Sequence, residues 1–129
     1  MNTNRATTYT LLAVGYISQH RNQKFITSQT IAKEYGLPQD YLTKLLLQLV
    51  RATVIRSKRG PRGGFYLAAP PNKITLLQVI EAVEGPMVGG IGLSEGAKRK
   101  LSVKTKQTYA KALNQAKAVF QKTKISDLL

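Results

Sequence analysis

The amino-acid sequence predicts a mainly α-helical fold that carries one small β-hairpin and ends in a long helix. Three observations support this prediction. Apolar residues recur at helical spacing over most of the chain, a basic Gly-rich turn joins two short apolar runs, and the last third carries an extended apolar stripe. A chain of 129 residues is long enough for one domain with a hydrophobic core and too short for two.

Three helices are predicted in the first half of the chain. The first covers residues 5–20. The second covers residues 29–35, with Thr27 or Ser28 as its N-cap and Gly36 as the residue that ends it. The third covers residues 39–52. Its buried stripe is Leu42, Leu45, Leu46 and Leu49, and its opposite face carries Asp40, Thr43, Lys44, Leu47 and Arg51.

A basic β-hairpin is predicted directly after the third helix. Residues 54–57 and 65–68 have the composition of short strands, and the turn between them reads KRGPRGG. A short helix, a glycine turn and a second helix form a helix-turn-helix. When a basic hairpin follows, the order is that of a winged helix, in which the hairpin is the wing.

The rest of the chain is expected to form two more helices. Thr75 caps a helix over residues 76–83, and residues 85–96, with five of the ten glycines, are expected to form a flexible loop. A long helix covers about residues 97–122, and residues 125–129 form an apolar turn, capped by Ser126, that is expected to dock on a surface that the sequence does not identify. The expected division is therefore a winged helix-turn-helix in residues 1–84, a loop in 85–96, and a dimerisation helix with a docking turn in 97–129.

The net charge indicates a polyanionic partner. Lys and Arg number 20 against six Asp and Glu, which gives +14. Residues 94–129 hold nine of the basic and two of the acidic residues, so this segment carries half of the net charge. A small and strongly basic domain is typical of proteins that bind nucleic acid.

The residue types present exclude several kinds of site. The chain has no cysteine, which excludes disulfides, thiolate nucleophiles and Cys-ligated metal clusters. Its single histidine, His20, is expected to be structural or exposed, and the acids show no paired-carboxylate or triad pattern. We therefore expect neither an enzyme nor a cofactor. Because no segment resembles a signal peptide or a membrane span, we expect a cytoplasmic, nucleoid-associated protein without a membrane partner.

Candidate DNA contacts cluster in three places. The start of the third helix offers base-reading groups: Lys44 for guanine, Gln39 for adenine, Asp40 for a cytosine amine, and Tyr41 for a phosphate. For Asp40, the alternative is that its side chain caps the helix. For the whole set, which also includes Thr43, the alternative is a helix face that is simply exposed to solvent. Backbone amides and hydroxyls at the start of the second helix suit a phosphate or simple N-capping. The residues there are Thr27, Ser28 and Gln29.

The hairpin turn is the third candidate. An arginine suits a narrow minor groove, and glycines let the backbone approach a phosphate strand closely. An ordinary turn with solvated charges is the alternative. The candidate residues are Lys58, Arg59, Gly60, Pro61, Arg62 and Gly63.

The stripe of the long helix predicts dimerisation. The apolar stripe would leave the long helix half exposed in a monomer, and burial against a second copy is the simplest way to cover it. The alternative is packing against its own domain. The stripe consists of Leu101, Tyr109, Leu113, Ala116 and Phe120.

From Arg5 to about Pro86 the chain resembles the Rrf family of IscR-like winged-helix transcription regulators. The resemblance is carried by RGPRGG and Phe65-Tyr66-Leu67 in the wing, by ITLLQVIEAVEG at 74–85, and by the helix pair at 31–49. It implies a homodimer whose long helices pair, with recognition helices in major grooves and wings in minor grooves. Many members hold an iron–sulfur cluster through three cysteines before the long helix. Residues 85–98 here read GPMVGGIGLSEGAK, so the cluster does not carry over.

Two functions therefore stand out. The first is a dimeric, sequence-specific regulator, expected to act as a repressor on double-stranded DNA. The alternative is a nonspecific nucleic-acid binder of the nucleoid or of RNA, since phosphate contacts carry no sequence information. An effector is left open: an unidentified small molecule near residues 87–93, a partner protein, or none.

Overall fold

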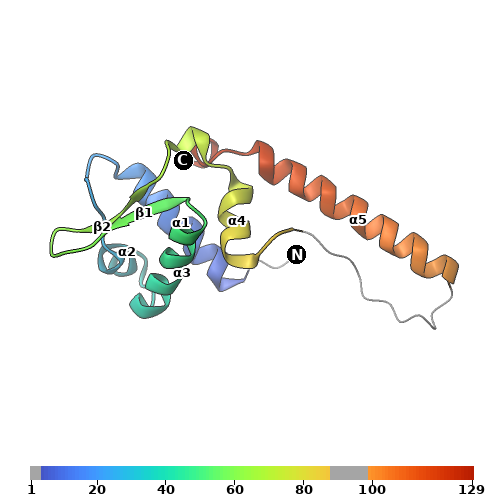
Figure 1. The fold of residues 1–129 in the computed structure, drawn as a ribbon, viewed down its shortest axis with the longest axis horizontal. Coiled ribbons are helices and arrows are strands. Elements are labelled where there is room, and N and C mark those ends of the chain that lie inside the picture. The colour runs from blue at the N-terminus through green and yellow to red at the C-terminus, as the bar shows by residue number, and fades with distance from the viewer. Residues whose placement is uncertain (1–3, 88–98) are drawn as a thin grey trace.

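The helical fold with one hairpin is confirmed. The computed structural model describes residues 4–87 and 99–129. The elements are α1 (Arg5–Gln19), α2 (Ser28–Tyr35), α3 (Gln39–Arg51), β1 (Ile55–Lys58), β2 (Gly64–Leu67), α4 (Leu76–Glu84) and α5 (Arg99–Lys122), with short 3₁₀ turns at Pro71–Lys73 and Ile125–Leu128. Helices α1 to α4 and the hairpin pack into one body, from which α5 extends (Figure 1). Most of the Gly-rich loop predicted at 85–96 lies outside the described residues.

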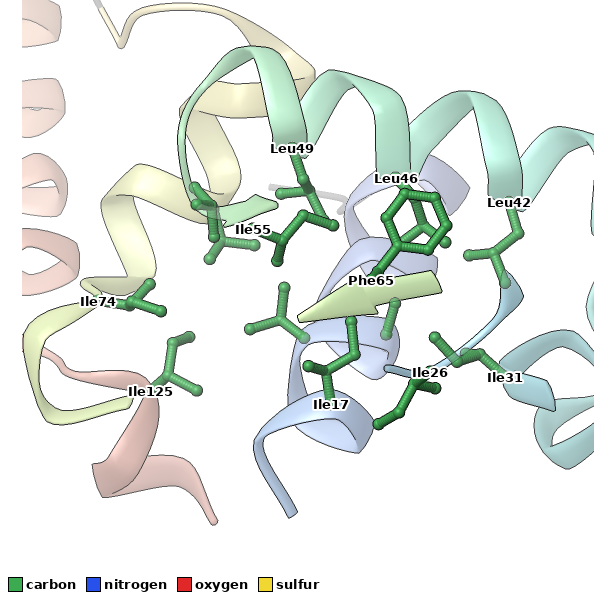
Figure 2. Close-up of a cluster of buried hydrophobic side chains, with 14 of the residues drawn as sticks. Ile17, Ile26, Ile31, Leu42, Leu46, Leu49, Ile55, Phe65, Ile74 and Ile125 are labelled. Atoms are coloured by element: carbon green, nitrogen blue, oxygen red, sulfur yellow. The ribbon is translucent and has the colours of Figure 1, made fainter. Parts of the chain in front are cut away.

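The hydrophobic core lies between α1, α3 and the hairpin, and α2 and α4 close its sides. The predicted α3 stripe is buried throughout, with Leu42, Leu46 and Leu49 fully inaccessible. Figure 2 shows these side chains meeting Ile17 of α1 and Phe65 of β2. On the opposite face of α3 most residues are exposed, as the helical spacing predicts, and Thr43 is half-buried.

Local capping explains where α2 and α4 begin. Thr27 Oγ1 accepts a hydrogen bond from the Thr30 N–H at 3.2 Å, and Gly36 ends α2 in the left-handed conformation with φ of 65°. Thr75 and Gln78 form a reciprocal capping box at α4. Asp40 does not cap α3, which was the alternative to its base-contact role, because Pro38 occupies the N-cap position and no side chain makes a cap hydrogen bond there.

Helix α3 ends with an unusual residue. Thr53 has a φ of +59°, and its N–H donates to the Val50 carbonyl at 3.0 Å, while the Val54 N–H donates to the Leu49 carbonyl at 3.0 Å. This is the hydrogen-bond pattern of a Schellman motif, in which glycine normally occupies the left-handed position. A β-branched residue there is strained. The strain is tolerated because the motif places Val54 and Ile55 in the core.

The hairpin is joined by a third extended segment that the sequence did not reveal. Strands β1 and β2 pair antiparallel, with Ile55 opposite Leu67 and Lys58 opposite Gly64. Ile26 pairs with Phe65 on the other edge of β2 through two backbone hydrogen bonds of 3.0 and 2.7 Å. The segment between α1 and α2 is therefore fixed to the base of the wing.

The predicted docking of the last turn is confirmed, and the structure shows that it packs on the chain's own domain, with a cap that differs from the expected one. Ile125 is buried, and its N–H donates to the Ile74 carbonyl at 2.9 Å. The expectation of a Ser126 cap is wrong. The side chain that accepts from the Lys124 N–H, at 2.9 Å, belongs to Asp127. A carboxylate at this position makes a charge-assisted bond, which a serine does not.

Candidate nucleic-acid interface

The start of α3 presents a row of exposed polar side chains. Gln39, Asp40 and Lys44 are all exposed. Tyr41 is 40% exposed, and its ring packs edge-on against Tyr9 of α1, with ring centroids 5.9 Å apart. The α1 contact orients the Tyr41 ring, so this residue projects from α3 as an anchored side chain.

Thr43 lies differently from its neighbours on this face. It is half-buried, and its Oγ1 lies 2.9 Å from Ser28 Oγ and 2.9 Å from the Gln39 carbonyl oxygen. The hydroxyl therefore links the first turn of α2 to the first turn of α3. This link fixes the angle between the two helices, a role that helical spacing alone does not predict.

The start of α2 combines capping with exposed polar groups. The N-capping role of Thr27 is confirmed, since its hydroxyl accepts from the Thr30 N–H. Ser28 is half-buried against Thr43, and Gln29 is exposed. The first turn of α2 nonetheless has the partial positive charge of a helix N-terminus, which suits a phosphate group.

The wing turn exposes three cations. Lys58, Arg59 and Arg62 are all exposed, and the Gly63 N–H donates to the Gly60 carbonyl at 3.0 Å to close the turn. A Cβ atom at Gly63 would lie 1.9 Å from the Lys58 carbonyl oxygen. Glycine is thus required at 63 by the turn itself, a reason separate from close approach to DNA.

One short segment connects all three places. Lys58 Nζ lies 5.2 Å from the centroid of the Phe25 ring, a cation–π contact. Ile26 pairs with β2, Thr27 caps α2, and Ser28 contacts Thr43 on α3. Residues 25–28 therefore hold the wing, the start of α2 and the start of α3 together. Figure 1 shows these elements at the end of the molecule opposite to the one from which α5 extends.

Aromatic side chains pack the C-terminal end of α1 against the C-terminal end of α2. The Tyr16 ring stacks on His20 with centroids 3.9 Å apart, and it meets the Tyr35 ring edge-on at 6.1 Å. His20 Nδ1 lies 2.8 Å from the Tyr16 carbonyl oxygen, so its role is structural, as expected. Burial, Glu34 and Tyr16 together raise the pKa of the Tyr35 phenol above its usual 10.

Helix α5 carries the predicted apolar stripe on a largely exposed surface. Leu101 and Tyr109 are 63% and 44% exposed, whereas the stripe residues near the domain are half-buried, namely Leu113, Ala116 and Phe120. Val119, at the edge of the predicted stripe, is 61% exposed, and the stripe analysis missed Val103, which is 47% exposed. The 24-residue helix is about 36 Å long, and its C-terminal end is tied to α4, where the Leu76 N–H donates to the Thr123 carbonyl at 2.8 Å.

The region near residues 87–93, one of the three open options for an effector, lies almost wholly outside the described residues. Only Met87 is described, and its N–H donates to Glu81 Oε2 at 2.6 Å. Of the helices that the structure describes, none is long and apolar enough to cross a membrane.

Comparison with known proteins identifies the family. The family described as "Rrf2: Iron-dependent Transcriptional regulator" matches residues 3–129. The chain is 38% identical to an Aquifex aeolicus protein over 73 residues, which is 57% of this chain and 50% of that protein. It is 27% identical over 117 residues to the HTH-type transcriptional regulator IscR of Cereibacter sphaeroides, covering 88% of this chain and 76% of that one. In the first three curated relatives, the matched segment spans only 38–50% of their length.

A solved structure shows the same fold. The structure of CymR, the global cysteine regulator of B. subtilis, superposes with a TM-score of 0.81 at 23% identity, covering 99% of this chain and 95% of that chain. The mainly helical fold with an antiparallel hairpin wing and a long C-terminal helix is therefore shared.

The iron dependence in the family description does not fit the residues of this chain. Iron–sulfur clusters are held by cysteine thiolates, and the chain has no cysteine and one histidine. Among residues 4–87 and 99–129, no group of three His, Asp or Glu side chains is placed to hold a metal ion. With a family match over nearly its full length and relatives that are transcription regulators rather than enzymes, the chain belongs to the Rrf2 family of transcriptional regulators.

Proposed function

We propose that the chain is a homodimeric repressor that binds a specific site on double-stranded DNA, with α3 in the major groove and the wing in the adjacent minor groove. The observation that carries this proposal is the connection made by residues 25–28, which hold the exposed start of α3 and the basic wing in one fixed arrangement. A rigid pair of reading elements favours specific recognition over loose attraction to phosphates.

Each element has a distinct part in the proposed complex. On α3, Lys44 donates to guanine O6 or N7, Gln39 pairs with adenine, and Asp40 accepts from a cytosine amine. Tyr41 and the start of α2 contact phosphates, which fix the register but carry no sequence information. On the wing, Arg59 or Arg62 enters the minor groove, where the negative potential is strongest, and Lys58 approaches the backbone.

Dimerisation through α5 completes the reading surface. Pairing of two α5 helices covers apolar side chains that are otherwise in water, including Leu101 and Val119. A two-fold dimer places two α3 helices on half-sites about 34 Å or a multiple of it apart. Residues 1–84 are then the DNA-binding domain and residues 97–129 the dimerisation unit. Repression follows simply, because a dimer that covers two half-sites excludes other proteins from that DNA on the nucleoid.

A nonspecific nucleic-acid binder remains the second candidate. The observation that favours it is the charge of residues 94–129, which carry nine basic and two acidic residues away from the reading elements. Cations placed in this way attract any polyanion, and the attraction falls steeply with salt.

A fluorescence anisotropy titration distinguishes the two functions. The duplex from upstream of the protein's own gene is compared with a scrambled duplex of equal length at several salt concentrations. A specific regulator binds the upstream duplex about 10³-fold more tightly at moderate salt. Equal affinities that collapse together as salt rises indicate the nonspecific binder.

A further inference from the structure

An open groove lies between the C-terminal end of α1 and strand β2. Its walls are the last turn of α1, the turn that follows it, and strand β2 with the residues up to Pro70. Its volume is about 440 Å³, within the range of small-molecule sites. In Figure 1 the turn after α1 lies above the hairpin and α3 below it. None of the residues that line the groove is among the proposed DNA contacts.

The chemistry of the groove is that of a site for an amphipathic anion. Ile17, Leu67 and Ala69 give it an apolar floor that continues the hydrophobic core. Arg21 and Lys24 are exposed on its rim, and none of the residues that line it is acidic. The Arg21 Nε–H donates to the Ser18 carbonyl at 3.0 Å, which orients the guanidinium. Two cations above an apolar floor complement a molecule with an apolar body and one anionic group.

We propose that this groove binds a small organic anion with an apolar body and that occupancy changes the position of the wing. The physical link is Tyr66, which lines the groove and packs edge-on against Phe25, with ring centroids 5.6 Å apart. The Phe25 ring in turn carries Lys58 Nζ at 5.2 Å. A ligand that displaces the Tyr66 ring therefore also shifts the Phe25 ring, which contacts the ammonium group of Lys58 on the wing.

This coupling rests on the proposed function, whereas the binding site does not. A ligand alters DNA affinity only if its affinity differs between the conformation in which the wing can bind DNA and the conformation in which the wing is displaced. Contact with Tyr66 provides that difference. The site itself is testable without DNA.

Binding is tested on the full chain with the fluorescent anion 1-anilinonaphthalene-8-sulfonate. We expect saturable binding of one dye per chain, and about tenfold or greater weakening in the Arg21→Gln/Lys24→Gln variant, on the scale of a charge-assisted hydrogen bond. The matched control, Lys104→Gln/Lys111→Gln, removes the same charge from exposed positions on α5 and should bind like wild type. N-phenyl-1-naphthylamine, which lacks the sulfonate, should bind more weakly to wild type. Equal loss in both variants, or tighter binding of the neutral dye, would overturn the site.

Coupling is tested by filter binding of DNA with and without saturating dye. We expect about a fivefold or greater change in DNA affinity for wild type, within the usual range of allosteric coupling. The Tyr66→Ala variant should still bind dye through the two cations but lose the change. Dye binding with unaltered wild-type DNA affinity would overturn the coupling. If the chain binds dye in this manner but no DNA, the site stands and the proposed function fails.

Discussion

Replacing Gly63 by alanine provides a sharp test of the wing geometry. The added Cβ would lie 1.9 Å from the Lys58 carbonyl oxygen and 2.8 Å from its carbon, although Cβ atoms in proteins almost never approach another atom within 3.0 Å. The Lys58 backbone must therefore move by more than 1 Å, and the turn bond from Gly63 to Gly60 opens. Forced overpacking costs about 1–3 kcal/mol and the lost hydrogen bond about 1 kcal/mol, so we expect roughly 2–4 kcal/mol of destabilisation at the hairpin.

Two assays measure this change against a matched glycine variant. Thermal unfolding at equal chain concentration should show Tm lowered by roughly 5–10 °C, and DNA affinity should fall by about tenfold as the wing cations move. Gly15→Ala is the control. It lies inside α1, where the new Cβ meets only Leu129 Cδ2 at 4.0 Å, so alanine should stabilise by about 0.5–1 kcal/mol. If Gly63→Ala matches wild type in both assays, the tight-turn reasoning is wrong.

Three further predictions concern the wing, the dimer and the end of α3. Arg59→Ala should weaken binding to the specific duplex by about 1–3 kcal/mol, with Lys73→Ala as control, and unchanged affinity would place the wing outside the interface. Leu101→Glu should give a folded monomer in sedimentation equilibrium, since this side chain is 63% exposed, and a persisting dimer would refute the α5 interface. Thr53→Asn should raise the free energy of unfolding by about 0.5–1 kcal/mol by relieving a left-handed β-branched residue, and a loss of stability would contradict that strain.

The sequence predicted most of the fold because its local signals agree. Apolar spacing, Thr27, Thr75 and Gly36 each mark a helix or a helix end within a few residues, and the structure follows them. The strands were placed to within one residue by composition and a Gly-rich turn. Local chemistry is sufficient in these places because caps and turns depend on neighbours in the chain.

What the sequence did not reveal depends on residues that are distant along the chain. The pairing of Ile26 with Phe65 has no local signature, and neither has the hydrogen bond of Thr7 Oγ1 to Glu84 Oε1, at 2.5 Å, that ties α1 to α4. A threonine disfavours the left-handed conformation, so the sequence does not predict it at Thr53. Thr53 adopts it because the next residue, Val54, packs in the core. The groove beside Arg21 also forms only when α1 and β2 come together.

Selection from a library of random duplexes tests the central claim most directly. The purified chain is incubated with the library at moderate salt, and bound DNA is recovered and sequenced over several rounds. A dimeric, sequence-specific regulator enriches one motif with two-fold symmetry, whose half-sites are about one helical turn, or a multiple of it, apart. Recovery of DNA without an enriched motif would contradict the account and leave a chain that binds phosphates through its charge alone.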